Sequence, residues 1–297
     1  MMNNKLTRRE FLRGTALAGA AAVVGLPMRS GWGEEALSKT RVVLVRDADV
    51  LSDAGEVDSE IIADMLDKAV CALFDKQNPV DAWKRIISAD DIVGIKTNAW
   101  HYLPTPSEME QAVRRRVLET GVAEENISID DRGILGNPVF QKSTALVNVR
   151  PLRTHNWAGI GGCIKNYIMF VPRPDAYHGN SCADLATIWQ MPHVKGRTRL
   201  NILVLLTPLF YGLGPHHFDR KYTWQYGGIL AGTDPVAIDT TGLRILEAKR
   251  LEYFKEYRPM TPPAHHVKIA DTRHGLGISD PDRIELVRLG WQDGALI

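Results

Sequence analysis

The residues best suited to chemistry lie in a glycine-rich segment that begins near a histidine and ends near a lysine. It runs from Thr154 to Asn166 as T-H-N-W-A-G-I-G-G-C-I-K-N. Glycines let a backbone approach a ligand closely, and a lysine that follows them can meet an anion. The spacing is not that of the phosphate loop G-x-x-x-x-G-K-[ST], because Asn166 follows Lys165 and the glycines stand too close together. The structural alternative is a glycine-hinged turn that opens a helix.

Two other segments carry polar groups that could join this site. Lys96-Thr97-Asn98 directly follows an apolar strand, and ligands of open α/β sheets sit beyond the carboxyl ends of the strands. A strand-end turn with a solvent-reaching lysine explains these residues equally well. Asp239 stands in an apolar run, where a carboxylate is costly to bury unless it is paired or bound to a metal. Asp234 precedes Pro235 and is most simply a helix N-cap.

Histidines and cysteines give weaker signals. His155 stands apart from the other histidines because it shares a segment with Lys165, although no H-E-x-x-H helix or other metal-ligand spacing is present. A thiolate site at Cys163 is a minor hypothesis. The chain has three cysteines, Cys71, Cys163 and Cys182, with no C-x-x-C spacing. This pattern excludes a ferredoxin-type cluster. A bridge between the last two stays open.

These candidates depend on an alternation of strand-like and helix-like segments. The pattern predicts an α/β fold with a mostly parallel central sheet, flanked by helices, in one unit over residues 39–297, and irregular loops at the strand carboxyl ends. The longest irregular segments are expected at 154–181 and 208–227. Strands are expected at 41–46, 92–96, 126–130, 145–149, 201–207, 229–231, 266–269 and 284–287, and helices at 58–74, 106–120 and 234–246.

The first 33 residues have the pattern of a twin-arginine signal peptide. Arg8 and Arg9 precede Phe11 and Leu12, as in the bacterial Tat signal. The small and apolar stretch at 15–26 is about 12 residues long, whereas a membrane-spanning helix needs about 20. The sequence therefore predicts an exported, periplasmic protein, and residues 1–33 are left out of the fold prediction.

The charge of the mature chain excludes one class of partner. The whole chain has 36 basic and 35 acidic residues, and residues 1–33 contain five of the basic and one of the acidic ones. The remainder has 31 basic and 34 acidic residues, a net charge near −3. Nucleic-acid binding would favour a basic face, so no nucleic-acid partner is expected. No later segment has 18 uninterrupted apolar residues, so the mature form is not expected to span a membrane.

Three ordered motifs resemble the family catalogued as domain of unknown function 362. They are I-V-G-I-K-T-N at 92–98, the segment at 154–166, and G-G-I-L-A-G-T-D-P-V-A-I-D at 227–239, and H-G-L-G at 274–277 is similar to that family's ending. Many relatives carry ferredoxin-type modules, which implies that the family works together with redox proteins. The three cysteines of this chain cannot hold an iron–sulfur cluster themselves. The resemblance implies a site made from Lys96, Asn98, His155, Lys165, Asn166, Asp234 and Asp239.

The sequence leads to two hypotheses from different classes. In the first, the protein binds an anionic ligand, metal or cofactor, with a redox-associated role. Lys96 and Lys165 would neutralise the ligand, and His155 with Asp239 would do proton or metal work. In the second, the protein is a non-catalytic accessory or assembly factor for a periplasmic or membrane redox complex, and the aromatic residues of 208–227 contact the partner protein. The sequence leaves the cofactor, the metal and the question of enzymatic activity open.

Overall fold

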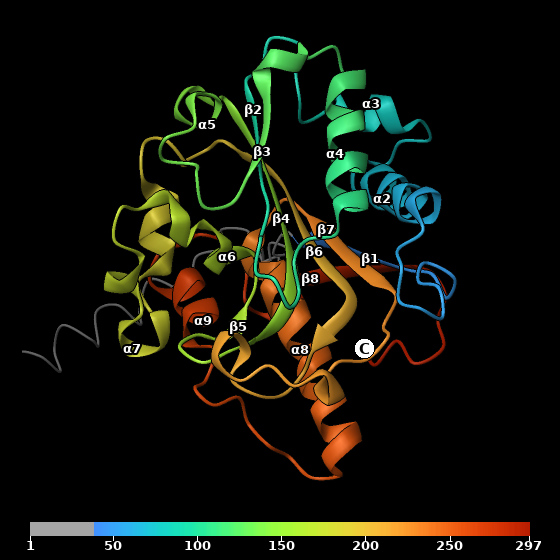
Figure 1. Cartoon of the computed structure of the whole chain (residues 1–297), viewed down its shortest axis with the longest axis vertical. Coiled ribbons are helices and arrows are strands. Elements are labelled where there is room, and N and C mark those ends of the chain that lie inside the picture. The colour runs from blue at the N-terminus through green and yellow to red at the C-terminus, as the bar shows by residue number, and fades with distance from the viewer. Residues whose placement is uncertain (1–38) are drawn as a thin grey trace, which may run out of the picture. The chain divides into compact units, whose positions relative to one another are not determined.

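The computed structural model describes residues 39–297, which are built around one sheet (Figure 1). The strands follow one another across the sheet in the order β3-β2-β4-β6-β7-β1-β8, and the short β5 pairs with β4 alone. Their bounds are β1 Thr40–Arg46, β2 Val93–Lys96, β3 Ile127–Asp130, β4 Ala145–His155, β5 Gly159–Gly161, β6 Thr198–Leu209, β7 Gly228–Gly232 and β8 Ile284–Gly290.

The sheet is mostly parallel. Strands β3, β2, β4 and β6 run parallel to one another, as β1 does to β8. Strand β7 is antiparallel to both β6 and β1, and the short β5 is antiparallel to β4. The carboxyl ends of β2, β4 and β6 therefore lie at one edge, where an α/β sheet holds its ligands. This arrangement confirms the predicted fold class.

Helices cover both faces of the sheet, and alternate strand residues point to each face. Val43 and Val45 of β1 pack with α2, α3 and α4, while Val42 and Leu44 pack with α6, α8 and α9. Figure 1 shows these two groups on opposite sides. The helix bounds are α2 Ser59–Phe74, α3 Pro79–Trp83, α4 Ser107–Glu119, α5 Pro138–Lys142, α6 Cys163–Asn166, α7 Gly179–Cys182, α8 Pro235–Phe254 and α9 His265–Thr272. Short 3-10 helices are η1 Glu124–Asn126, η2 Tyr167–Phe170, η3 Pro174–Tyr177, η4 Leu185–Gln190, η5 Gly214–His216, η6 Arg220–Tyr222 and η7 Pro281–Arg283.

Most predicted elements are present, with three corrections. Strand β4 continues beyond Val149 to His155, so the first residues of the predicted irregular segment are extended. Helix α8 continues to Phe254, eight residues past the predicted end. Residues 266–269 are not a strand but part of α9, in which the buried positions have the helical spacing His266, Val267 and Ala270.

Two other expectations concern the signal peptide and membrane-spanning helices. The predicted signal peptide at 1–33 lies outside the described residues. Within residues 39–297, every helix is too short or too polar to cross a membrane.

Candidate functional site

The carboxyl edge of the parallel strands contains a cavity of about 430 Å³. Of the predicted site residues, Asn98 follows β2, His155 ends β4, and Lys165 and Asn166 belong to α6. The cavity is lined by Asn98, Trp100, Asp131, Arg132, Arg150, Arg153, His155, Trp157, Lys165, Asn166, Ile168, Met169, Pro174 and His178. Four of the seven predicted residues therefore share one cavity. We call it the α6 cavity.

Helix α6 is fixed at its start by a carboxylate from a distant helix. Asp239 of α8 accepts the backbone N–H groups of Cys163, at 2.6 Å, and Ile164, at 2.9 Å. Gly162 precedes them, and a Cβ there would overlap the carboxylate of Asp239. The glycine thus leaves room for the cap. Asp239 is fully buried, and this burial raises its pKa to about 7 although the two backbone hydrogen bonds lower it.

The end of α6 is held by a network of amides. The Nδ2 of Asn166 donates to Asn148 Oδ1 at 2.8 Å and to the carbonyl oxygen of Lys96 at 3.2 Å. Asn148 in turn donates to the carbonyl oxygen of Cys163 at 3.0 Å and to Asn201 Oδ1 at 2.9 Å. These bonds connect α6 to β2, β4 and β6, so the position of its side chains is set by the sheet.

Lys96 lies beneath the cavity as half of a buried ion pair. Its Nζ is 2.5 Å from Asp131 Oδ1, donates to the carbonyl oxygen of Thr97 at 2.7 Å, and lies 3.5 Å from Asn166 Oδ1. Burial lowers the pKa of Lys96 to about 8, against the attraction of Asp131. Burial would raise the pKa of Asp131, but Lys96 outweighs it and the pKa falls. The charge of Lys96 is therefore compensated within the protein.

Two arginines of β4 add positive charge to the cavity wall. Arg150 donates to the carbonyl oxygen of Gly162 at 3.3 Å, and Arg153 donates to Asn98 Oδ1 at 3.0 Å. The guanidinium of Arg153 also lies 4.3 Å from the centre of the Trp100 ring. Burial lowers the pKa of both arginines, and the neighbouring Arg150 lowers that of Arg153 further. Among residues 39–297, the buried Nε atoms of both arginines have no hydrogen-bond partner.

Lys165 differs from Lys96 because no carboxylate of residues 39–297 forms an ion pair or hydrogen bond with it. It is 3% exposed, and its Nζ donates to Cys182 Sγ at 3.7 Å. Burial lowers its pKa to about 8, and the positive charges of Arg150 and Arg153 act in the same direction. An uncompensated buried ammonium is costly, so Lys165 favours either an anionic neighbour or the neutral amine.

The histidines near Lys165 are held in the neutral form. Nδ1 of His155 accepts the N–H of Trp157 at 3.2 Å, which places the ring proton on Nε2. Burial, together with the charge of Lys165, lowers the pKa of His155. The same causes lower the pKa of His178 to about 4 and that of the fully buried His266 to about 3.

Asp234 has a structural role at the start of α8 and does not belong to the cavity. It caps α8 by accepting the N–H groups of Val236 and Ala237, and its other oxygen accepts that of Ile278 at 2.8 Å. A Cβ on Gly277 would overlap its carboxylate. The segment at 274–277 therefore packs on the start of α8, and neither Asp234 nor Asp239 lines the α6 cavity.

Metal and disulfide chemistry find little support in the described residues. Within residues 39–297, no group of three or more His, Cys, Asp or Glu side chains is arranged to hold a metal ion. The thiols of Cys71, Cys163 and Cys182 are free. Burial raises the pKa of the Cys163 thiol, with Asp239 adding to the effect, which opposes a thiolate there.

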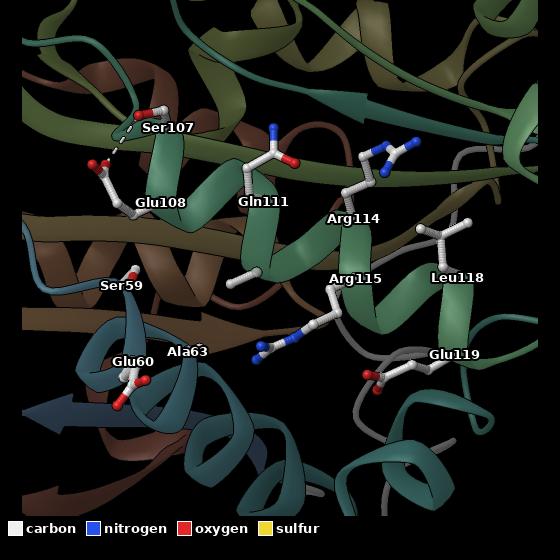
Figure 2. Close-up of a pocket in the computed structure, with 11 residues that line it drawn as sticks. Ser59, Glu60, Ala63, Ser107, Glu108, Gln111, Arg114, Arg115, Leu118 and Glu119 are labelled. Carbon is white, nitrogen blue, oxygen red and sulfur yellow. Dashed lines mark hydrogen bonds between the residues drawn. The ribbon is translucent and has the colours of Figure 1, made fainter.

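A larger hollow lies between α2 and α4, away from the predicted site residues (Figure 2). Its walls carry both acidic and basic side chains, such as Glu60 and Arg115, and the hydroxyl of Ser107 donates to Glu108 at 3.1 Å. Arg114 and Arg115 line it, and Arg114 pairs with Glu124. The adjacent Arg116 pairs with Asp67 and Glu119. The polar side chains that line this hollow are all exposed or half-buried, so we place the candidate site in the α6 cavity.

The aromatic residues of 208–227 pack mainly within the chain. Phe210 and Tyr226 are buried, and Tyr211, Tyr222 and Trp224 pack against the same core. The ring of Phe210 contacts those of Tyr222, Trp224, Tyr253 and Phe254. Tyr211, Phe218, Tyr222 and Trp224 are half-buried, so part of this segment's aromatic surface stays exposed.

Fold and site together define an α/β protein with a cation-lined cavity at the carboxyl edge of its parallel strands. Residues 132–244 match the model of the family described as Domain of unknown function (DUF362). This match supports the resemblance seen in the motifs, and it includes β4, α6 and the start of α8 but not Lys96. No curated protein and no solved structure matches the chain significantly.

The sequence missed Asp131, Asn148, Arg150, Arg153 and Asn201. Arg150 and Arg153 had one usable signal, which is two arginines in an apolar stretch that enters the glycine-rich segment. The amides of β4 and β6 gave no signal along the chain, because their partners come from other elements.

Proposed function

We propose that the protein binds a small anionic ligand in the α6 cavity. The observation that carries this proposal is the imbalance of buried charge around the cavity. Lys96, Arg150, Arg153 and Lys165 are each at most 3% exposed, whereas the nearby buried carboxylates are Asp131 and Asp239. An anion in the cavity would offset this excess of positive charge.

The lining of the cavity suits a ligand that has an apolar part besides its charged group. Guanidinium and ammonium groups line the cavity together with the half-buried Ile168, Met169 and Pro174. Trp157, 40% exposed and stacked on His178, adds an aromatic surface. The volume of about 430 Å³ is in the range of small-molecule pockets.

The direct test is calorimetric titration of the protein, in a buffer without competing anions, with lactate, oxalate and inorganic phosphate. We expect at least one anion to bind and Arg153→Met to weaken that binding about ten- to hundredfold, since a hydrogen bond to a charged group contributes about 1.5–3 kcal/mol. Lys195→Met, which removes an exposed lysine, is the matched control. If none of the three anions binds, the proposal fails.

We also propose that residues 1–33 direct the protein to the periplasm by the Tat route, and that its role there is redox-associated. The support is the twin-arginine pattern and the resemblance described above. Replacement of Arg8 and Arg9 together by lysine should leave the protein in the cytoplasmic fraction of its native host. Unchanged export of this variant would contradict the proposal.

The second candidate is a non-catalytic accessory or assembly factor for a redox complex. One observation favours it, since Tyr253 and Tyr257 at and beyond the end of α8 are 50% and 73% exposed. We rank it second because the excess of buried positive charge around the α6 cavity favours a small anion over a partner protein. Stable co-purification of a redox protein that is lost on Tyr257→Ala, with the fold retained, would support it.

A further inference from the structure

Lys165 has the surroundings of a lysine that reacts as a nucleophile, and Lys96 serves as an internal comparison. Both ammonium groups are buried, but Lys96 is bonded to Asp131, whereas Lys165 lines the α6 cavity and has no carboxylate partner in the part of the chain that the structure describes. A lysine becomes nucleophilic when it is desolvated or when other cations lie near it. Lys165 meets both conditions, because Arg150 and Arg153 line the same cavity.

The other groups of the cavity match a carbonyl next to a carboxylate. A guanidinium such as that of Arg153 holds a carboxylate by paired hydrogen bonds. His155 is neutral with its proton on Nε2, and a neutral imidazole can polarise a carbonyl oxygen. The cavity thus combines an amine, a carboxylate partner and a hydrogen-bond donor for a carbonyl.

We propose that Lys165 forms an imine with a small 2-oxo acid bound in the α6 cavity. The nitrogen lone pair attacks the carbonyl carbon, and the carbonyl π electrons move to oxygen, which takes up a proton while nitrogen releases one. The resulting hydroxyl group then leaves with a second proton as water, and nitrogen forms the double bond to carbon. The balance is amine plus ketone giving imine plus water, with no oxidant or reductant. This inference rests on the proposed anion binding.

Reductive trapping tests the imine. The full-length protein is incubated with pyruvate and cyanoborohydride, and modified peptides are identified by mass spectrometry. We expect one dominant adduct at Lys165, none at that position in Lys165→Met, and an unchanged adduct in Lys195→Met. Arg153→Met keeps the amine but loses a carboxylate partner, so its adduct should form at least about tenfold more slowly, which corresponds to about 1.4 kcal/mol.

Two small molecules separate the imine from anion binding. Lactate has the carboxylate of pyruvate without the carbonyl, so it should bind and slow trapping. Acetone has the carbonyl without the carboxylate, so it should trap poorly. Lactate binding without a pyruvate adduct at Lys165 would overturn the imine and leave the proposed function intact. Neither binding nor adduct would overturn both, and equal trapping by acetone and pyruvate would overturn the assignment to 2-oxo acids.

Discussion

The two buried lysines should respond to the same substitution with opposite changes in stability. Burial lowers the pKa of Lys165 from 10.5 to about 8, which at about 1.4 kcal/mol per pH unit corresponds to about 3 kcal/mol of unfavourable free energy for its charged form. Methionine keeps the apolar stem and removes the charge. Lys165→Met should therefore increase the free energy of unfolding at pH 7 by up to about 3 kcal/mol, while it abolishes trapping by pyruvate. Lys96→Met should instead decrease it by about 3–5 kcal/mol, because it leaves the carboxylate of Asp131 buried without its cation.

The pH dependence of the stability gives a second check on the sign of the Lys165 contribution. Between about pH 8 and 10.5 the unfolded chain holds a proton on Lys165 more strongly than the folded protein does, so this residue's unfavourable contribution is complete below pH 8 and disappears above 10.5. The advantage of Lys165→Met should accordingly shrink from pH 7 to pH 10. Urea unfolding of the wild-type and variant proteins at both pH values measures it. If Lys165→Met is destabilised at pH 7 as strongly as Lys96→Met, the charge of Lys165 is compensated and our reasoning is wrong.

Three further predictions concern the cap of α6 and the charge of the cavity. Gly162→Ala should lower the free energy of unfolding by about 1–3 kcal/mol in urea unfolding, because the added Cβ meets the Asp239 carboxylate, and an unchanged value would contradict the cap. Burial raises the pKa of Asp239 to about 7, so its contribution to stability should be lost as the pH rises from about 4 to 7. In urea unfolding, the free energy of unfolding of the wild type relative to Asp239→Asn should fall over the same pH range. Lactate affinity, measured by calorimetry, should fall as the pH rises through about 8, because Lys165 and Lys96 lose their protons there. The neighbouring His155 is already neutral and Asp131 is already ionised, so neither adds to this change. An affinity that does not change with pH would exclude a contribution of either lysine to lactate binding.

The sequence was sufficient for the residues that follow strands directly. Lys96 ends an apolar strand and Asn98 follows it, so the rule for the carboxyl edge of a parallel sheet places both correctly. The positions of Arg150, Arg153 and His155 are not predictable in this way, because the sequence pattern predicts a strand that ends at Val149 whereas β4 continues to His155. Pairing with β6 on one side and β5 on the other keeps this stretch extended, and neither contact is visible along the chain.

Asp239 shows what the energetic cost of burying a carboxylate can predict from the sequence alone. Its position in an apolar run correctly indicated that a buried carboxylate needs a partner, and we expected a metal or a proton. The structure gives it the N–H groups of α6, a helix of four residues that is far too short to be stable alone. Since α6 depends on Asp239 at its start and on Asn148 at its end, Lys165 is held in place before any ligand arrives. Such preorganisation avoids the entropic cost of ordering a long lysine side chain on binding, which suits a nucleophile better than a surface contact.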